Sequence, residues 1–221
     1  MPLMQILKKR EVDLALLLVA AFWGGSYLAA KELTEHTSVV ALLAIRFSIT
    51  SIAMFAIWTI KQTAITRSEA LLGLGLGSVQ ALILFFETSG VARTSATNAG
   101  LIISLCIVLT PILESVASKN WLPRSFFVTA VTAVVGVALL VSDKGFAAPS
   151  VGDWLMLAAA VVRAIHVTSM GHLTKGKSYS SVSITLLQSL ACAFIFLIFS
   201  GNQTIGAVSY THLTLPTKRI V

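Results

Sequence analysis

Residues 39–60 read VVALLAIRFSITSIAMFAIWTI, an apolar stretch in which Arg46 is the one charged side chain. A helix needs about 20 mostly apolar residues to cross a bilayer, so this stretch predicts a transmembrane helix. Arg46 lies eight residues after Ser38, or about 12 Å along a helix, which is farther than its side chain comfortably spans. We therefore expect Arg46 to meet an internal partner or a wet cavity.

The composition of the whole chain also indicates a membrane protein. Of its 221 residues, 56% are hydrophobic and 11% are charged, and the mean hydropathy is +0.89, as in membrane proteins with many spans. The net charge of +7 does not indicate nucleic acid, because the basic residues occupy short connectors between apolar runs. Cys106 and Cys192 lie inside apolar runs without metal-ligand spacing. We expect neither a metal nor a cofactor.

Seven apolar segments are long enough to span a membrane. The first is too long for the core of a cleaved signal peptide and is followed by six others, so we expect it to stay as a helix. The predicted fold is an all-α polytopic membrane protein, with spans at about 13–31, 38–60, 69–91, 95–117, 123–142, 152–172 and 181–200.

The lysines and arginines of the connectors predict the orientation. With the N-terminus inside, nine fall on the inner side: Lys8, Lys9, Arg10, Lys61, Arg67, Lys119, Arg124, Lys175 and Lys177. Three fall on the outer side: Lys31, Arg93 and Lys144. Because short cytoplasmic loops are enriched in Lys and Arg, we expect a cytoplasmic N-terminus.

Two parts of the chain resemble each other. The stretch from Asp13, DLALLLVAAFWGGSYLAAKELT, and the stretch from Asp153, DWLMLAAAVVRAIHVTSMGHLT, share an Asp, several aliphatic positions and a closing Leu-Thr. The offset covers five spans, so the second copy would be inserted upside down, as in transporters with inverted repeats. We expect a first repeat of five spans over residues 1–145 and the first two spans of a second repeat over 150–206.

The C-terminal stretch VSYTHLTLPTKRIV changes character from about Val208. It resembles a translated sequencing adapter at the end of a fragmentary gene, and we expect residues 207–221 to be non-native. A short strand or a disordered tail is the alternative.

Four stretches together resemble the drug/metabolite transporter superfamily, in its EamA-like branch: AFWGGSYLAAKEL, LLAIRFSIT, TSATNAGLIISLCIVLTPILE and VVGVALLVSD. The resemblance covers about residues 10–200. It implies ten helices in two inverted five-helix repeats, of which seven are visible here. It also implies a secondary transporter that exports small organic metabolites or drugs by alternating access.

The resemblance also implies the surroundings of the protein. We expect a multi-pass protein of the bacterial or archaeal inner membrane, with a small-molecule substrate and the lipid bilayer as partners and no nucleic acid. A coupling proton, a counter-substrate and a homodimer stay open. The alternatives are a membrane-embedded lipid-modifying enzyme and an accessory helical protein without a cavity, although we expect no enzyme activity.

Glu87 is the partner that depth along the membrane favours for Arg46. Arg46 lies eight residues from the outer end of its span and Glu87 about four from the outer end of the next, so their depths differ by about 6 Å. Glu114 lies near the inner end of its span. We predict an Arg46–Glu87 pair, with two roles open for Arg46: locking helices together, or lining the substrate cavity.

Arg163 and His166 share a helix face, being three residues apart. Arg163 aligns in the repeat with Trp23, and a cationic and an aromatic wall would suit a substrate with an anionic group and an apolar body. His166 is a candidate proton-coupling group or a buried core histidine.

Other polar residues within spans are weaker candidates for the cavity, since each can instead bond across helices or cap one. They are Ser26, Gln80, Asn98 and Gln188. Gly73 and Gly77 form a small-xxx-small pair that predicts close helix approach. Pro111 predicts a kink in the fourth span.

Overall fold

A computed structural model of the chain describes residues 2–141 and 149–201. Every element in these ranges is a helix. The tail that we expect to be non-native and Lys144 lie outside the described residues. The helices are α1 (Pro2–His36), α2 (Val39–Lys61), α3 (Arg67–Arg93), α4 (Ala96–Ser104), α5 (Cys106–Ser118), α6 (Arg124–Val141), α7 (Val151–Thr174) and α8 (Ser181–Ser200).

Seven helical segments in the described ranges are long and apolar enough to cross a membrane, with α4 and α5 together forming the fourth. The predicted all-α, multi-pass fold is therefore confirmed. Five helices begin directly after a Ser or Thr whose side-chain oxygen accepts a backbone N–H of the first turn, which satisfies a donor that the helix itself leaves unpaired. These caps are Ser38, Thr66, Ser95, Ser150 and Ser180.

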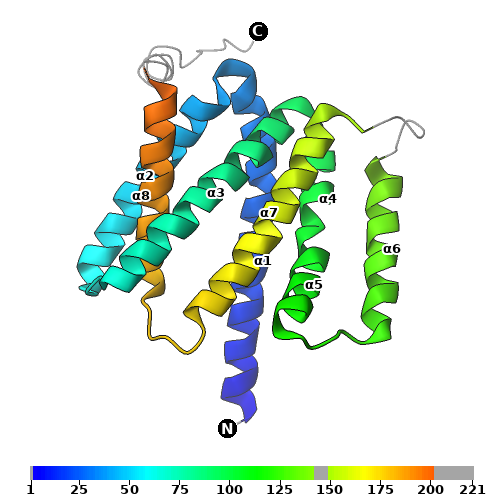
Figure 1. Cartoon of the computed structure of the whole chain (residues 1–221), viewed down its shortest axis with the longest axis horizontal. Helices are drawn as coiled ribbons and strands as arrows, with labels where there is room; N and C mark the ends of the chain where they lie inside the picture. The colour runs from blue at the N-terminus through cyan, green and yellow to red at the C-terminus, as the bar shows by residue number, and fades with distance from the viewer. Residues whose placement is uncertain (1, 142–148, 202–221) are drawn as a thin grey trace.

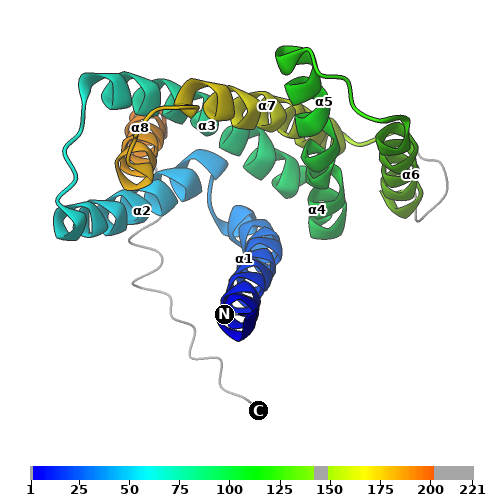
Figure 2. The same ribbon diagram turned by 90° about the horizontal axis from the view of Figure 1, so that it is seen from below.

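Successive spans run in alternating directions, so α7 runs opposite to α1 and α8 opposite to α2 (Figure 1). α3 packs along both α7 and α8, and α8 packs along α2. Seen from below, α3 and α7 cross the centre of the molecule, α6 lies at one edge and α1 stands to the side of α3 (Figure 2). The helices of the expected second repeat thus lie between helices of the first.

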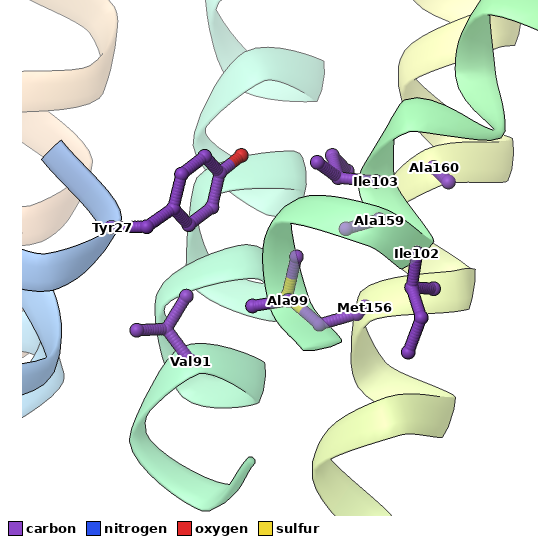
Figure 3. Close-up of a cluster of buried hydrophobic side chains, with 8 residues drawn as sticks. All are labelled: Tyr27, Val91, Ala99, Ile102, Ile103, Met156, Ala159 and Ala160. Carbon is purple, nitrogen blue, oxygen red and sulfur yellow. The ribbon is translucent and has the colours of Figure 1, made fainter. Parts of the chain in front are cut away.

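Two hydrophobic clusters hold this arrangement. One joins α1, α3, α4 and α7, where Tyr27, Val91 and Met156 converge (Figure 3). The other joins α2, α3 and α8 around Leu43 and the buried Cys192. Burial of apolar area is the main stabilising term in such contacts outside lipid, and close packing is the main one within it.

Glycines allow α3 to approach α8 closely, as predicted. A Cβ at Gly77 would lie 2.7 Å from the Cβ of Ala191 and 2.8 Å from the Cα of Gln188, and one at Gly73 would lie 2.6 Å from the Cβ of Leu187. No side chain larger than hydrogen fits these positions without displacing the facing helix.

Two acidic side chains fasten α3 to the expected second repeat at opposite ends. Glu69 completes a capping box with Thr66, and its other oxygen accepts the backbone N–H of Ser180 at 2.8 Å. Asp153 completes a capping box with Ser150, and its other oxygen accepts the hydroxyl of Thr94 at 2.6 Å. Both acids are buried and use both carboxylate oxygens.

The fourth span is interrupted at Leu105, six residues before the predicted kink at Pro111. The backbone N–H of Leu105 donates to the carbonyl of Ile102 at 3.1 Å, a tighter turn than the α-helix has. Pro111 lies inside α5, which continues past it to Ser118. The interruption at Leu105 was not predicted, and the kink expected at Pro111 stays a prediction.

Candidate functional site

A buried ion pair joins α3 to α7. The guanidinium of Arg163 donates from Nη2 to Oε2 of Glu87, and the two side chains are 16% and 10% exposed. The hydroxyl of Tyr27 on α1 donates to the other carboxylate oxygen, Oε1, at 2.5 Å. Both oxygens of Glu87 are therefore engaged, which is the condition for a buried charge to be tolerated.

The predicted Arg46–Glu87 pair was wrong, because Glu87 pairs with Arg163 instead. Similar depth in the membrane does not determine which face of a helix a side chain occupies. α3 packs extensively along α7 and only slightly against α2, so the carboxylate is directed at the guanidinium of α7. Glu114, the other candidate partner, lies 3.0 Å from Nε2 of His172.

The ring of Trp23 covers the Arg163 guanidinium from α1. The guanidinium carbon lies 5.6 Å from the ring centroid, within the range of a cation–π contact. Nε of Arg163 is buried and has no hydrogen-bond partner among the described residues. The predicted cationic and aromatic pair is thus brought together, with the cation already neutralised by Glu87.

Arg46 faces a hollow of about 200 Å³ between α1, α2 and α3. Its lining is Ser26, Ala29, Ala30, Leu33, Leu42, Leu43, Arg46 and Thr88. A much smaller adjoining space, of about 10 Å³, is lined by both Arg46 and Glu87. Within the described ranges Arg46 forms no ion pair, and its recorded contact is with the ring of Phe47, 5.9 Å away.

The remaining predicted site residues divide into two groups. Ser26 lines the hollow, and its hydroxyl donates to the carbonyl of Trp23 at 2.6 Å. His166 is buried one turn from Arg163 on α7, and its Nε2 has no partner in the described structure. Trp23, Ser26, Arg46, Glu87 and Arg163 therefore surround one region, with His166 beside it.

Gln80, Asn98 and Gln188 are not brought to this region. The amide of Gln188 lies 3.8 Å from Sδ of Met170, and its backbone packs against Gly77. Asn98 sits in the first turn of α4 and donates its backbone N–H to the Ser95 cap. Gln80 is half-buried on α3 and lines none of the hollows described above.

Sequence reasoning missed Tyr27 and Thr88. Tyr27 follows Trp23 by one helical turn, a spacing that places the two on one face and could have indicated a shared role. Thr88 adjoins Glu87 in the chain, is buried, and lines both the hollow and the smaller space. No sequence feature separates it from the many threonines that bond to their own helix.

A larger hollow than the one at Arg46 lies elsewhere, between α2, α3 and α8. It measures about 540 Å³ and is lined by apolar side chains apart from Ser78. Ligand sites usually combine an apolar wall with a few placed polar groups, so we assign no solute site to this groove.

Comparisons with known proteins agree with this architecture. The profile of the EamA-like transporter family matches residues 11–142. An uncharacterized transporter of Archaeoglobus fulgidus is 27% identical over 207 residues, which make up 90% of this chain and 63% of the relative. The chain thus spans less than two thirds of that protein's length. No solved structure matches the chain.

Proposed function

Because this chain belongs to the EamA-like transporter family, we propose that it acts in secondary transport. In this proposal it exports small organic metabolites or drugs across the inner membrane by alternating access, with its N-terminus in the cytoplasm. The two expected inverted repeats would move relative to each other around a site near the midplane.

The observation that supports this proposal is the cluster of Glu87, Arg163, Tyr27 and Trp23, in which the ion pair and Tyr27 are largely buried and the Trp23 ring is partly exposed. It joins α1 and α3 of the expected first repeat to α7 of the second, with the hollow at Arg46 beside it. Ionisable residues inside a membrane are costly and typically mark solute or ion pathways. A cluster that spans both repeats lies where relative motion of the repeats would change it.

The geometry of Glu87 argues against its use as the general base of the alternative, a lipid-modifying enzyme. A general base must have a carboxylate oxygen or imidazole nitrogen free to take a proton from the reacting group. Both oxygens of Glu87 are engaged, by Tyr27 and by Arg163. The carboxylate is therefore placed to hold helices and charges rather than to start a reaction.

Side-dependent labelling tests alternating access. Cys106 and Cys192 are first replaced by alanine, and Ser26→Cys then puts a thiol in the hollow. A membrane-impermeant thiol reagent is applied to right-side-out and to inside-out vesicles. An alternating-access protein is labelled at this position from both sides, whereas a static bundle is labelled from one side or from neither, which would contradict the proposal.

Ser95→Cys is the matched control, since Ser95 is an exposed cap at the start of α4. It should be labelled from one side only. The charge count predicts that this side is outside the cell, so labelling from the cytoplasmic side would overturn the proposed orientation.

A further inference from the structure

The charged side chains around the site, Glu87, Arg163 and Arg46, carry a net charge of one positive unit. Glu87 carries the negative charge, and Arg163 neutralises it in a close pair. Arg46 lines the space next to Glu87 but forms no ion pair with any described residue. Tyr27 and Arg163 engage both oxygens of the carboxylate, so the positive charge without an ionic partner among these three groups is that of Arg46.

A second polar group is free at the same place. Thr88 is 5% exposed and lines the hollow together with Arg46. Its hydroxyl forms no hydrogen bond within the described ranges, whereas most serines and threonines of these helices donate to a carbonyl of their own helix. Because Thr88 lines the hollow, a ligand oxygen there can accept from its hydroxyl.

We propose that Arg46 and Thr88 bind the carboxylate of a small organic monoanion, whose apolar part occupies the hollow between α1, α2 and α3. This inference rests on the proposed function, because it names the substrate class of that site. It moves the anion-binding role from Arg163, which the sequence indicated, to Arg46, which forms no ion pair with a described residue.

The lining determines the rest of the ligand. A guanidinium presents two parallel N–H groups that match the two oxygens of a carboxylate. Apart from Ser26, Arg46 and Thr88, the hollow is lined by alanine and leucine, which suit a hydrocarbon body. Its volume of about 200 Å³ is below the range of about 300–1,000 Å³ typical for drug-sized ligands, so the substrate is a small molecule.

Glu87 is the reason that the ligand should carry only one negative charge. A second carboxylate on the ligand would enter the small space that Glu87 shares with Arg46 and would meet like charge there. A neutral analogue would leave the guanidinium unpaired. The site therefore favours a monoanion over both a dianion and a neutral molecule of the same shape.

Binding of radiolabelled benzoate to the purified full chain in lipid nanodiscs tests this, with empty nanodiscs subtracted. Unlabelled benzoate, benzamide and phthalate compete as the monoanion, the neutral analogue and the dianion. We expect benzoate to compete at least about tenfold better than the other two. Arg46→Gln should weaken benzoate binding by about tenfold or more, Arg46→Lys by less, and Thr88→Val by a few-fold.

Arg124→Gln is the matched control, because Arg124 is an exposed arginine at the start of α6, outside the hollow. It should bind benzoate like the unmodified protein. The competition series uses the unmodified protein alone, so the test stands even if an Arg46 variant fails to fold.

Three results would overturn the inference: no saturable benzoate binding up to about 10 mM, equal competition by benzamide, or unchanged binding by Arg46→Gln. The labelling of Ser26→Cys separates these from a failure of the proposed function. Labelling from both sides without anion preference overturns the substrate class alone. Anion preference with labelling from one side overturns alternating access alone.

Discussion

The guanidinium carbon of Arg163 lies 5.6 Å from the centre of the Trp23 ring, and these two residues occupy the same position in the two similar stretches of the chain. Their offset of 140 residues equals that between Asp13 and Asp153. Residues related by a two-fold axis can touch only near that axis. If the two stretches are inverted repeats, as their sequences predict, the axis passes beside Glu87.

Replacing Trp23 tests whether its ring stabilises the cation. Trp23→Leu should lower the free energy of unfolding by about 0.5–2 kcal/mol through loss of the cation–π contact, in addition to lost packing. In an Arg163→Gln background the same change should cost less. Unfolding by SDS titration in mixed micelles gives both values. Phe22→Leu is the control, since Phe22 is the neighbouring aromatic residue on α1 and is 77% exposed. Equal costs of Trp23→Leu in the two backgrounds would contradict the contact.

Replacing only one of Glu87 and Arg163 should lower the free energy of unfolding far more than replacing both together. Glu87→Gln or Arg163→Gln leaves one buried charge without its partner, which typically costs about 3–5 kcal/mol. The double variant leaves neither charge, so its loss of unfolding free energy should be smaller than the sum of the two single losses. The same SDS titration measures the coupling. Additive losses would mean that the two side chains do not interact.

The positions of the spans were predictable because they depend on hydropathy along the sequence and not on contacts between helices. The expected span at 181–200 matches α8 (Ser181–Ser200), and the one at 38–60 matches α2 within one residue. An apolar run of about 20 residues with a Ser or Thr cap specifies a membrane helix with little influence from its neighbours. The interruption at Leu105 was not predictable on this basis, because the sequence around it, LIISLCIVL, stays apolar apart from Ser104.

The partner of Glu87 was not predictable, because it depends on how helices pack side by side. Depth along the membrane favoured Arg46, but the packing of α7 against α3 brings Arg163 to the carboxylate instead. Tyr27 completes the carboxylate's hydrogen bonds from a third helix. Each contact joins residues at least 60 positions apart, and the spacing of residues within one helix does not specify which other helix they meet.

The contact between α3 and α8 predicts a sharp difference between two nearby glycines. Gly77→Ala should destabilise the protein by about 1–3 kcal/mol, because the new methyl group would meet Ala191 and the backbone of Gln188. Gly75→Ala should be neutral or stabilising by up to about 1 kcal/mol, since nothing lies within 4 Å of its Cβ position and alanine favours a helix. The melting temperatures of both variants in detergent provide the comparison, and similar values would contradict the close approach.

Asp13 and Asp153 align in the repeat, yet they have different roles in the structure. Replacing each by alanine therefore compares two aligned positions directly. Asp153 is buried, completes the capping box of α7 with Ser150 and accepts the hydroxyl of Thr94, so Asp153→Ala removes half of the capping box and leaves that buried hydroxyl without its partner. We expect a loss of about 1–3 kcal/mol of unfolding free energy.

Asp13 lies within α1, which begins at Pro2, so it caps no helix, and it is exposed without a hydrogen bond or ion pair in the described structure. Asp13→Ala should therefore change the unfolding free energy by less than about 0.5 kcal/mol. Thr94→Val, which removes the other half of the contact, should reproduce part of the Asp153→Ala loss. If instead Asp13→Ala and Asp153→Ala destabilised the protein equally, the aligned acids would share one role, and the fastening of α7 to α3 would not explain the burial of Asp153.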